Sequence, residues 1–237
     1  MQVLPSLRLT VNLNAVLRFQ VGVGDAATAV VGHDVAHSVV DPDDLLGIDP
    51  LHATPLAEAL PVIAAREQEM WILALPSPGV LGPLRGPAPT NRAALEAGEA
   101  VLAHTGGVAL VPHAVGRGVQ WRVHPADRPF APPTPYDAER TLGEAVLRAA
   151  DTLTRLQVAG GSRPAEDPGA ELAPGYTSRQ RAAADRAARL LLACEAALTS
   201  DGSAISSYEA EVRARELRRL RSAAADALCA AASWMNG

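Results

Sequence analysis

The stretch LALPSPGVLGPLRGPAP, residues 73–89, constrains the fold more than any other part of this sequence. Its five prolines and three glycines prevent it from continuing a strand ladder or a helix. The apolar run before it, residues 70–75, is typical of a strand buried on both faces. Thr90 or Asn91 can then cap a helix over residues 92–97. We therefore expect an ordered loop between a buried strand and a helix, a place where binding sites are common.

This loop, followed by AALEAGEAVL and GVALVPH, resembles a conserved family of uncharacterised proteins from high-GC actinobacteria. The resemblance extends over about residues 7–158. It implies a bacterial source and a cellular compartment. Because no activity is assigned to that family, the resemblance identifies neither an activity nor a functional residue in this chain.

Composition and charge exclude several classes of protein. All 21 basic residues are arginine and the net charge is −5, which argues against a general nucleic-acid or anionic-membrane binder. Two cysteines form neither a disulfide framework nor a zinc pattern. We find no signal peptide and no apolar run long enough to span a membrane, so we expect a cytoplasmic protein. We also expect no cofactor.

The first part of the chain, residues 1–124, is predicted to form one α/β domain. Apolar runs indicate strands at 35–40, 70–75, 101–104, 108–111 and 119–124. Helices are expected over about 12–19 and 26–31, and another near Pro55 or Pro61. Short turns between the last three strands favour antiparallel pairing. The predicted fold class is α+β, with a small mixed or antiparallel sheet of four to five strands and helices on one face.

Residues 125–136 form a proline-rich stretch that we interpret as a linker. The region after it, 137–237, is predicted to be helical. Thr134-Pro135-Tyr136-Asp137 is a capping box that begins a helix to about residue 158. Two longer helices, 178–198 and 208–234, are expected to form a hairpin whose apolar faces need a partner. Five arginines between 213 and 221 alternate with glutamates, which is typical of a solvated face.

One histidine pair has the spacing of a zinc motif. His33 and His37 stand four residues apart with Asp34 between them, so on a helix they could share a metal with His52 or Asp41 as a third ligand. Gly32 and the β-forming residues nearby favour a strand instead, in which case both are ordinary histidines. Metal binding through His33 and His37 is therefore kept as an alternative.

A second candidate site lies near the proline–glycine loop. Arg85, Asn91 and Arg92 belong to the loop and the helix after it, whereas His104, His113 and His124 stand near strand ends. If the strands are adjacent, these groups could converge to bind a small molecule or support acid–base chemistry. The alternative is that each histidine is simply a polar residue where a strand meets solvent.

Two hypotheses for function follow. No serine lies in a nucleophile motif, and both cysteines are far from every histidine in sequence. The leading hypothesis is a non-catalytic protein that forms a homodimer, or binds a protein partner, through its C-terminal helices. The alternative is a small-molecule-binding protein or an enzyme of unknown class with its site near residues 73–92.

Overall fold

The computed structural model describes residues 4–156, 170–199 and 206–235. The chain divides into two compact units. We call residues 2–132 with 171–177 and 232–237 the sheet unit, and residues 133–170 with 178–231 the helical unit.

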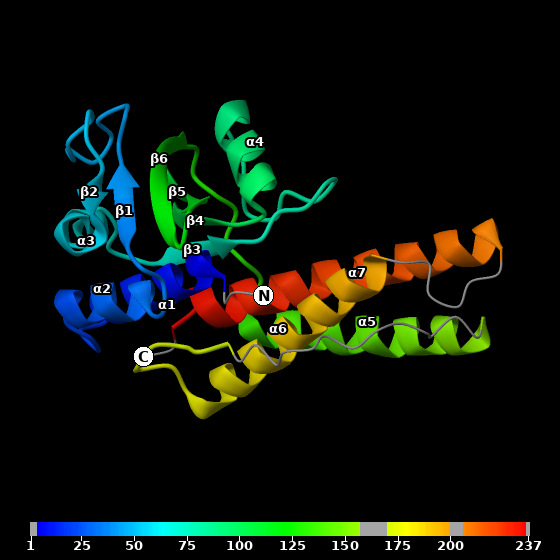
Figure 1. The fold of residues 1–237 in the computed structure, drawn as a ribbon. Helices are drawn as coiled ribbons and strands as arrows, with labels where there is room; N and C mark the ends of the chain where they lie inside the picture. Colours follow the sequence, from blue (N-terminus) through cyan, green and yellow to red (C-terminus); the bar gives the residue numbers. More distant parts are fainter. Residues whose placement is uncertain (1–3, 157–169, 200–205, 236–237) are drawn as a thin grey trace. The chain divides into compact units, whose positions relative to one another are not determined.

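A six-stranded mixed sheet, in the order β2-β1-β6-β5-β4-β3, forms the centre of the sheet unit (Figure 1). Its strands are β1 (His37–Val40), β2 (Thr54–Pro55), β3 (Trp71–Ala74), β4 (Ala100–Ala103), β5 (Gly107–Val115) and β6 (Gly118–Ala126). Strands β3 to β6 pair antiparallel in sequence order, and β1 pairs parallel with β6. The predicted α+β class and sheet type are confirmed, whereas the two-residue strand β2 was not predicted.

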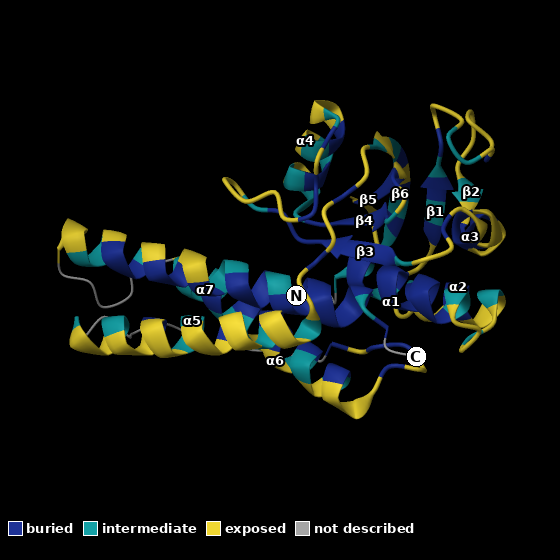
Figure 2. Ribbon diagram, turned by 180° about the vertical axis from the view of Figure 1, so that it is seen from behind, coloured by how far each residue is buried: buried dark blue, intermediate teal, exposed yellow. Residues whose placement is uncertain are grey.

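Helices cover both faces of this sheet (Figure 1). Helices α1 (Pro5–Leu17), α2 (Val23–Val31) and α3 (Leu56–Ala65) bury one face around Trp71 and Trp121. Helix α4 (Ala88–Ala97) and Leu84 bury a smaller core on the other face. The expectation of helices on one face is therefore wrong. Strands β3 and β4 are apolar and buried at every position (Figure 2), and such strands need cover on both sides.

Helix α1 begins earlier than the sequence indicated, at Pro5 rather than near residue 12. Proline suits the first helical turn because its missing N–H would have no partner there. Leu7, Leu9, Val11 and Leu13 alternate as in a strand, yet Ser6, Thr10, Asn12 and Asn14 are also buried. The helix is thus buried on nearly all sides, and this hides the 3.6-residue period that an amphipathic helix would show.

The loop between β3 and α4 is ordered by backbone hydrogen bonds. Ser77 and Val80 exchange two bonds of 2.8 Å across a tight turn. The N–H of Asp127 donates to Gly86 O at 2.9 Å, and that of Phe130 donates to Pro83 O at 3.0 Å. The stretch that we interpreted as a linker, 125–136, therefore begins inside β6 and continues along this loop.

The helical unit consists mainly of α5 (Pro135–Arg155), α6 (Ser178–Leu198) and α7 (Ser207–Ser233), whose last two residues belong to the sheet unit. The capping box is confirmed, because Thr134 Oγ1 accepts from the Asp137 N–H at 3.2 Å. Arg213 donates to Ala197 O at 2.9 Å, and Arg221 pairs with Glu195 at 2.9 Å. Only part of the predicted solvated arginine face is therefore solvated, since Arg213 is 3% exposed and links α7 to α6. Among the described residues, no helix combines the length and apolarity that crossing a membrane requires.

Candidate functional site

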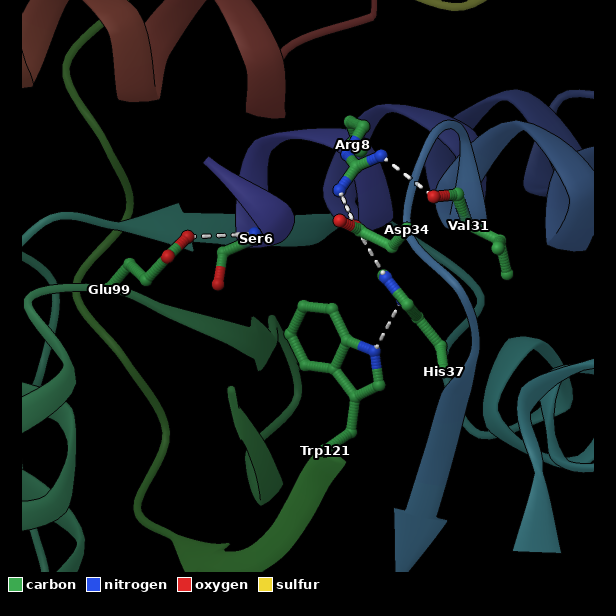
Figure 3. Close-up of polar contacts among 7 residues, drawn as sticks. All are labelled: Ser6, Arg8, Val31, Asp34, His37, Glu99 and Trp121. Carbon is green, nitrogen blue, oxygen red and sulfur yellow. Dashed lines mark hydrogen bonds and ion pairs between the residues drawn. The ribbon is translucent and has the colours of Figure 1, made fainter. Parts of the chain in front are cut away.

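A chain of four polar side chains lies beneath α1 in the sheet unit (Figure 3). Arg8 pairs with Asp34 Oδ2 and donates to Val31 O at 3.0 Å. The same Asp34 oxygen lies 2.9 Å from Nε2 of His37, and Trp121 Nε1 lies 3.2 Å from Nδ1 of His37. These residues come from α1, the turn after α2, β1 and β6, so the chain connects four elements.

The indole N–H determines the tautomer of His37. Trp121 Nε1 can only donate, so His37 Nδ1 must accept and the ring proton resides on Nε2, which donates to Asp34. Burial lowers the pKa of His37 despite the neighbouring carboxylate. Burial alone would raise the pKa of Asp34, but hydrogen bonds from His37 and Arg8 outweigh it and hold the pKa below its usual value. The resting state is a neutral imidazole beside an ionised carboxylate.

This carboxylate–imidazole pair is arranged like the Asp–His pair of a hydrolase, but it lacks a nucleophile and access to a substrate. The group on the other side of the imidazole is an indole N–H, which is not a nucleophile. The His37 side chain is fully buried, so it cannot act as a base toward a substrate. We conclude that the chain of contacts holds α1 against the sheet.

A second buried carboxylate lies at the start of α1 (Figure 3). Glu99, just before β4, accepts from the Ser6 N–H at 2.8 Å. Leu4 occupies the cap position and provides no side-chain hydrogen bond, so Glu99 supplies the missing acceptor. Burial raises the pKa of Glu99 to about 7, against the opposing effect of the Ser6 bonds and Arg8. The charge of Glu99 therefore changes near neutral pH.

The proposed metal pair is not arranged as a metal site. Helix α2 ends at Val31, His33 is exposed in the following turn, and His37 lies in β1 with both ring nitrogens bonded to protein. The possible third ligands are also engaged: Asp41 accepts backbone N–H groups, and His52 lies 3.0 Å from Asp49. Within 4–156, 170–199 and 206–235, no three His, Cys, Asp or Glu side chains form a metal-binding group.

The predicted ligand-binding residues are dispersed. Arg85 stacks 4.5 Å above the Phe130 ring, and Arg92 is exposed on α4. His104 lies 2.6 Å from Glu69, near the β4–β5 turn, whereas His113 stands toward the far end of β5. Asn91 is half-buried on α4, and its Oδ1 has no hydrogen-bond partner in the described parts of the chain. A ligand site formed by these residues stays a prediction.

Sequence reasoning missed the residues that the structure does connect. Arg8 and Asp34 are 26 positions apart, and Ser6 and Glu99 are 93 apart. No local pattern marks such pairs. Arg122 was also missed, although the alternation of buried and exposed residues along β6 places it on the same face as Gln120 and His124.

Comparisons with known proteins identify the family. A model described as Rv1486c-like protein, N-terminal domain, matches residues 6–138, and the corresponding C-terminal domain model matches residues 136–229. No curated protein and no solved structure matches the chain. The predicted resemblance to an actinobacterial family without a known activity is confirmed, and the match extends well beyond residue 158. The chain belongs to the Rv1486c-like protein family.

Proposed function

We propose that this protein acts through protein–protein contact rather than catalysis, and that it self-associates through α5 of the helical unit. The observation that carries the proposal is an exposed stripe along α5 (Figure 2). Its members recur at alternating intervals of four and three residues, and all are exposed: Tyr136, Arg140, Gly143, Leu147, Ala150 and Thr154. This spacing is that of a coiled-coil seam.

The stripe contains both a projecting side chain and a space to receive it. The Leu147 side chain is 73% exposed, and Tyr136 is 68% exposed. A Cβ atom added at Gly143 would meet nothing within 4 Å. An antiparallel pairing of two α5 helices, with its axis near residue 145, places Leu147 of each copy against Gly143 of the other.

The charges in the stripe fit the same antiparallel pairing. Arg140 of one copy would face Ala150 of the other and lie next to Asp151. Within one chain, Arg140 pairs with Glu144 at 3.0 Å, and Asp151 pairs with Arg155 at 2.8 Å. Along α5 these four charges run positive, negative, negative, positive, and the antiparallel pairing would bring Arg140 of one copy beside Asp151 of the other, which has the opposite charge.

Contact is favoured over catalysis because α5 exposes apolar residues, whereas the Asp34–His37 carboxylate–imidazole pair is buried. Sedimentation equilibrium tests the proposal. We expect a dimer that dissociates on dilution, and we expect Leu147→Asp to yield a monomer. Thr141→Asp is the matched control, since Thr141 is exposed on another side of α5 and the substitution adds the same charge. A wild-type monomer at all concentrations, or equal dissociation in both variants, would contradict the proposal.

A further inference from the structure

An open hollow lies beside the first half of α7 in the helical unit. Its volume is about 430 Å³, and small-molecule sites commonly have volumes of roughly 300–1,000 Å³. The described residues that line it lie on successive turns along one side of the helix: Ala210, Glu211, Ala214, Arg215 and Arg218. Because the hollow is open to solvent, a ligand can reach these side chains without any rearrangement of the protein.

The five arginines between residues 213 and 221 fall into two groups. Three of them stabilise the helical unit: Arg213 and Arg221 bond to α6, and Arg219 pairs with Glu216 at 2.8 Å. These guanidinium groups already have partners, so they are not available to a ligand. The two arginines that remain are the two that line the hollow.

Arg215 and Arg218 keep most of their capacity to donate hydrogen bonds. Both side chains are exposed. Arg215 has a contact of 3.7 Å with Glu216, which is longer than a hydrogen bond, and Arg218 makes no hydrogen bond or ion pair with any described residue. The two residues are three positions apart, about 4.5 Å along the helix axis. Each guanidinium can bind two oxygens of a carboxylate or a phosphate group.

The other lining residues indicate where in the hollow a ligand's charge would lie. Ala210 and Ala214 have small side chains, which leaves space beside the two arginines. Glu211, one turn before Arg215, is exposed and makes no ion pair within the described parts of the chain. The hollow therefore has two positive groups and one negative group, although the net charge of the chain is −5. Repulsion by Glu211 favours an anion whose charge lies close to Arg215 and Arg218.

We propose that this hollow binds a small molecule with two adjacent anionic groups, one held by Arg215 and the other by Arg218. Diphosphates and short dicarboxylic acids share this chemistry. The inference goes beyond self-association through α5, because α5 contributes no described residue to the hollow. It can therefore fail without affecting the proposed function.

Isothermal titration calorimetry of the full chain with pyrophosphate, in a metal-free buffer, tests the proposal. We expect saturable binding with a dissociation constant of about 1 mM or below, and binding of inorganic phosphate roughly tenfold weaker because it has one anionic group. Arg218→Gln removes a charge-assisted bond and should weaken pyrophosphate binding roughly tenfold or more. Glu211→Gln removes a repelling charge and should strengthen it. A parallel titration with malonate distinguishes the two ligand classes, since the tighter of the two probes indicates a diphosphate or a dicarboxylic acid.

The control is Arg186→Gln, which removes an exposed arginine from α6, outside the hollow, and should leave binding unchanged. Because Arg218 and Arg186 are both exposed, neither substitution should alter urea unfolding, and this measurement shows that both variants are folded. Absence of saturable binding of both pyrophosphate and malonate at about 10 mM, well above a millimolar dissociation constant, would overturn the proposal. An equal loss in Arg186→Gln and Arg218→Gln would also overturn it, because it would indicate general attraction of anions to arginine.

Discussion

The carboxamide of Asn14 pairs with the backbone of Trp71 as a neighbouring strand would. Its Oδ1 accepts from the Trp71 N–H at 2.7 Å, and its Nδ2 donates to Trp71 O at 2.9 Å. Strand β3 is at the edge of the sheet, and the next outward-facing N–H, that of Leu73, donates to Ser233 Oγ at 3.1 Å. The side chains of Asn14 and Ser233 thus bond to backbone groups of β3 that would otherwise be free to pair with another strand.

Replacing Asn14 should therefore be costly. Asn14→Ala leaves the N–H and C=O of Trp71 without partners in a buried position, and we expect a loss of about 3 kcal/mol in the free energy of unfolding. Asn12→Ala is the control: Asn12 is also buried in α1, but its side chain donates to Arg8 O within the same helix. Urea unfolding of both variants measures the difference. Equal losses would show that Asn14 does not protect the edge.

The two Asp–x–x–His pairs of the sheet unit should differ in their effect on stability. Asp34→Asn removes the partner of Arg8 in a site where the carboxylate is 3% exposed, and we expect a loss of about 3 kcal/mol. Asp49→Asn breaks a contact of similar length to His52, but both side chains are largely exposed, so the loss should be far smaller. Thermal or urea unfolding compares them. Similar losses would contradict the structural role of the buried pair.

His37 should remain neutral and keep its proton on Nε2 throughout the neutral range, because burial lowers its pKa and Trp121 donates to Nδ1. Nitrogen chemical shifts of the imidazole distinguish this tautomer from the alternatives. In Trp121→Phe, which removes the indole donor, the preference for Nε2–H should weaken. A charged His37 at pH 7, or the Nδ1–H tautomer, would be inconsistent with the network.

Glu99 should make stability fall as pH rises from about 4.5 to 7. Its pKa is near 4.5 in the unfolded chain and about 7 in the folded protein, so the folded state holds the proton longer. The stabilising effect is complete below the unfolded pKa and is lost as pH rises through the folded pKa. A shift of this size corresponds to about 3 kcal/mol.

Glu99→Gln keeps an acceptor for the Ser6 N–H but cannot ionise, so its stability should change less over the same pH range. Urea unfolding at several pH values gives the difference between the wild type and the variant. A difference that is constant with pH, or one that favours the wild type as pH rises, would refute the raised pKa.

Local patterns predicted most elements of the fold. The apolar run at residues 70–75 indicated β3, and the capping box at residues 134–137 indicated the start of α5. The strand-like alternation in α1 could not be interpreted correctly, since burial of Ser6, Thr10, Asn12 and Asn14 depends on tertiary packing. The helix α4 was predicted, but its position as a second layer was not, because all helices were expected on one face of the sheet. The polar contacts of Arg8, Asp34 and Glu99 join distant segments, so spacing along the chain gave no indication of them.

The central claim is that two α5 helices pair antiparallel, and cross-linking between two single-cysteine variants tests it most directly. Tyr136→Cys and Thr154→Cys would face one another across such a dimer, whereas two copies of residue 136 would lie about 27 Å apart along the helices. The native thiols, Cys194 and Cys229, are buried, and burial raises the pKa of Cys194 to about 11. We predict a disulfide-linked dimer when the two variants are mixed under mild oxidation, and none from either variant alone. No cross-link in the mixture, or equal cross-linking of each variant alone, would contradict the account.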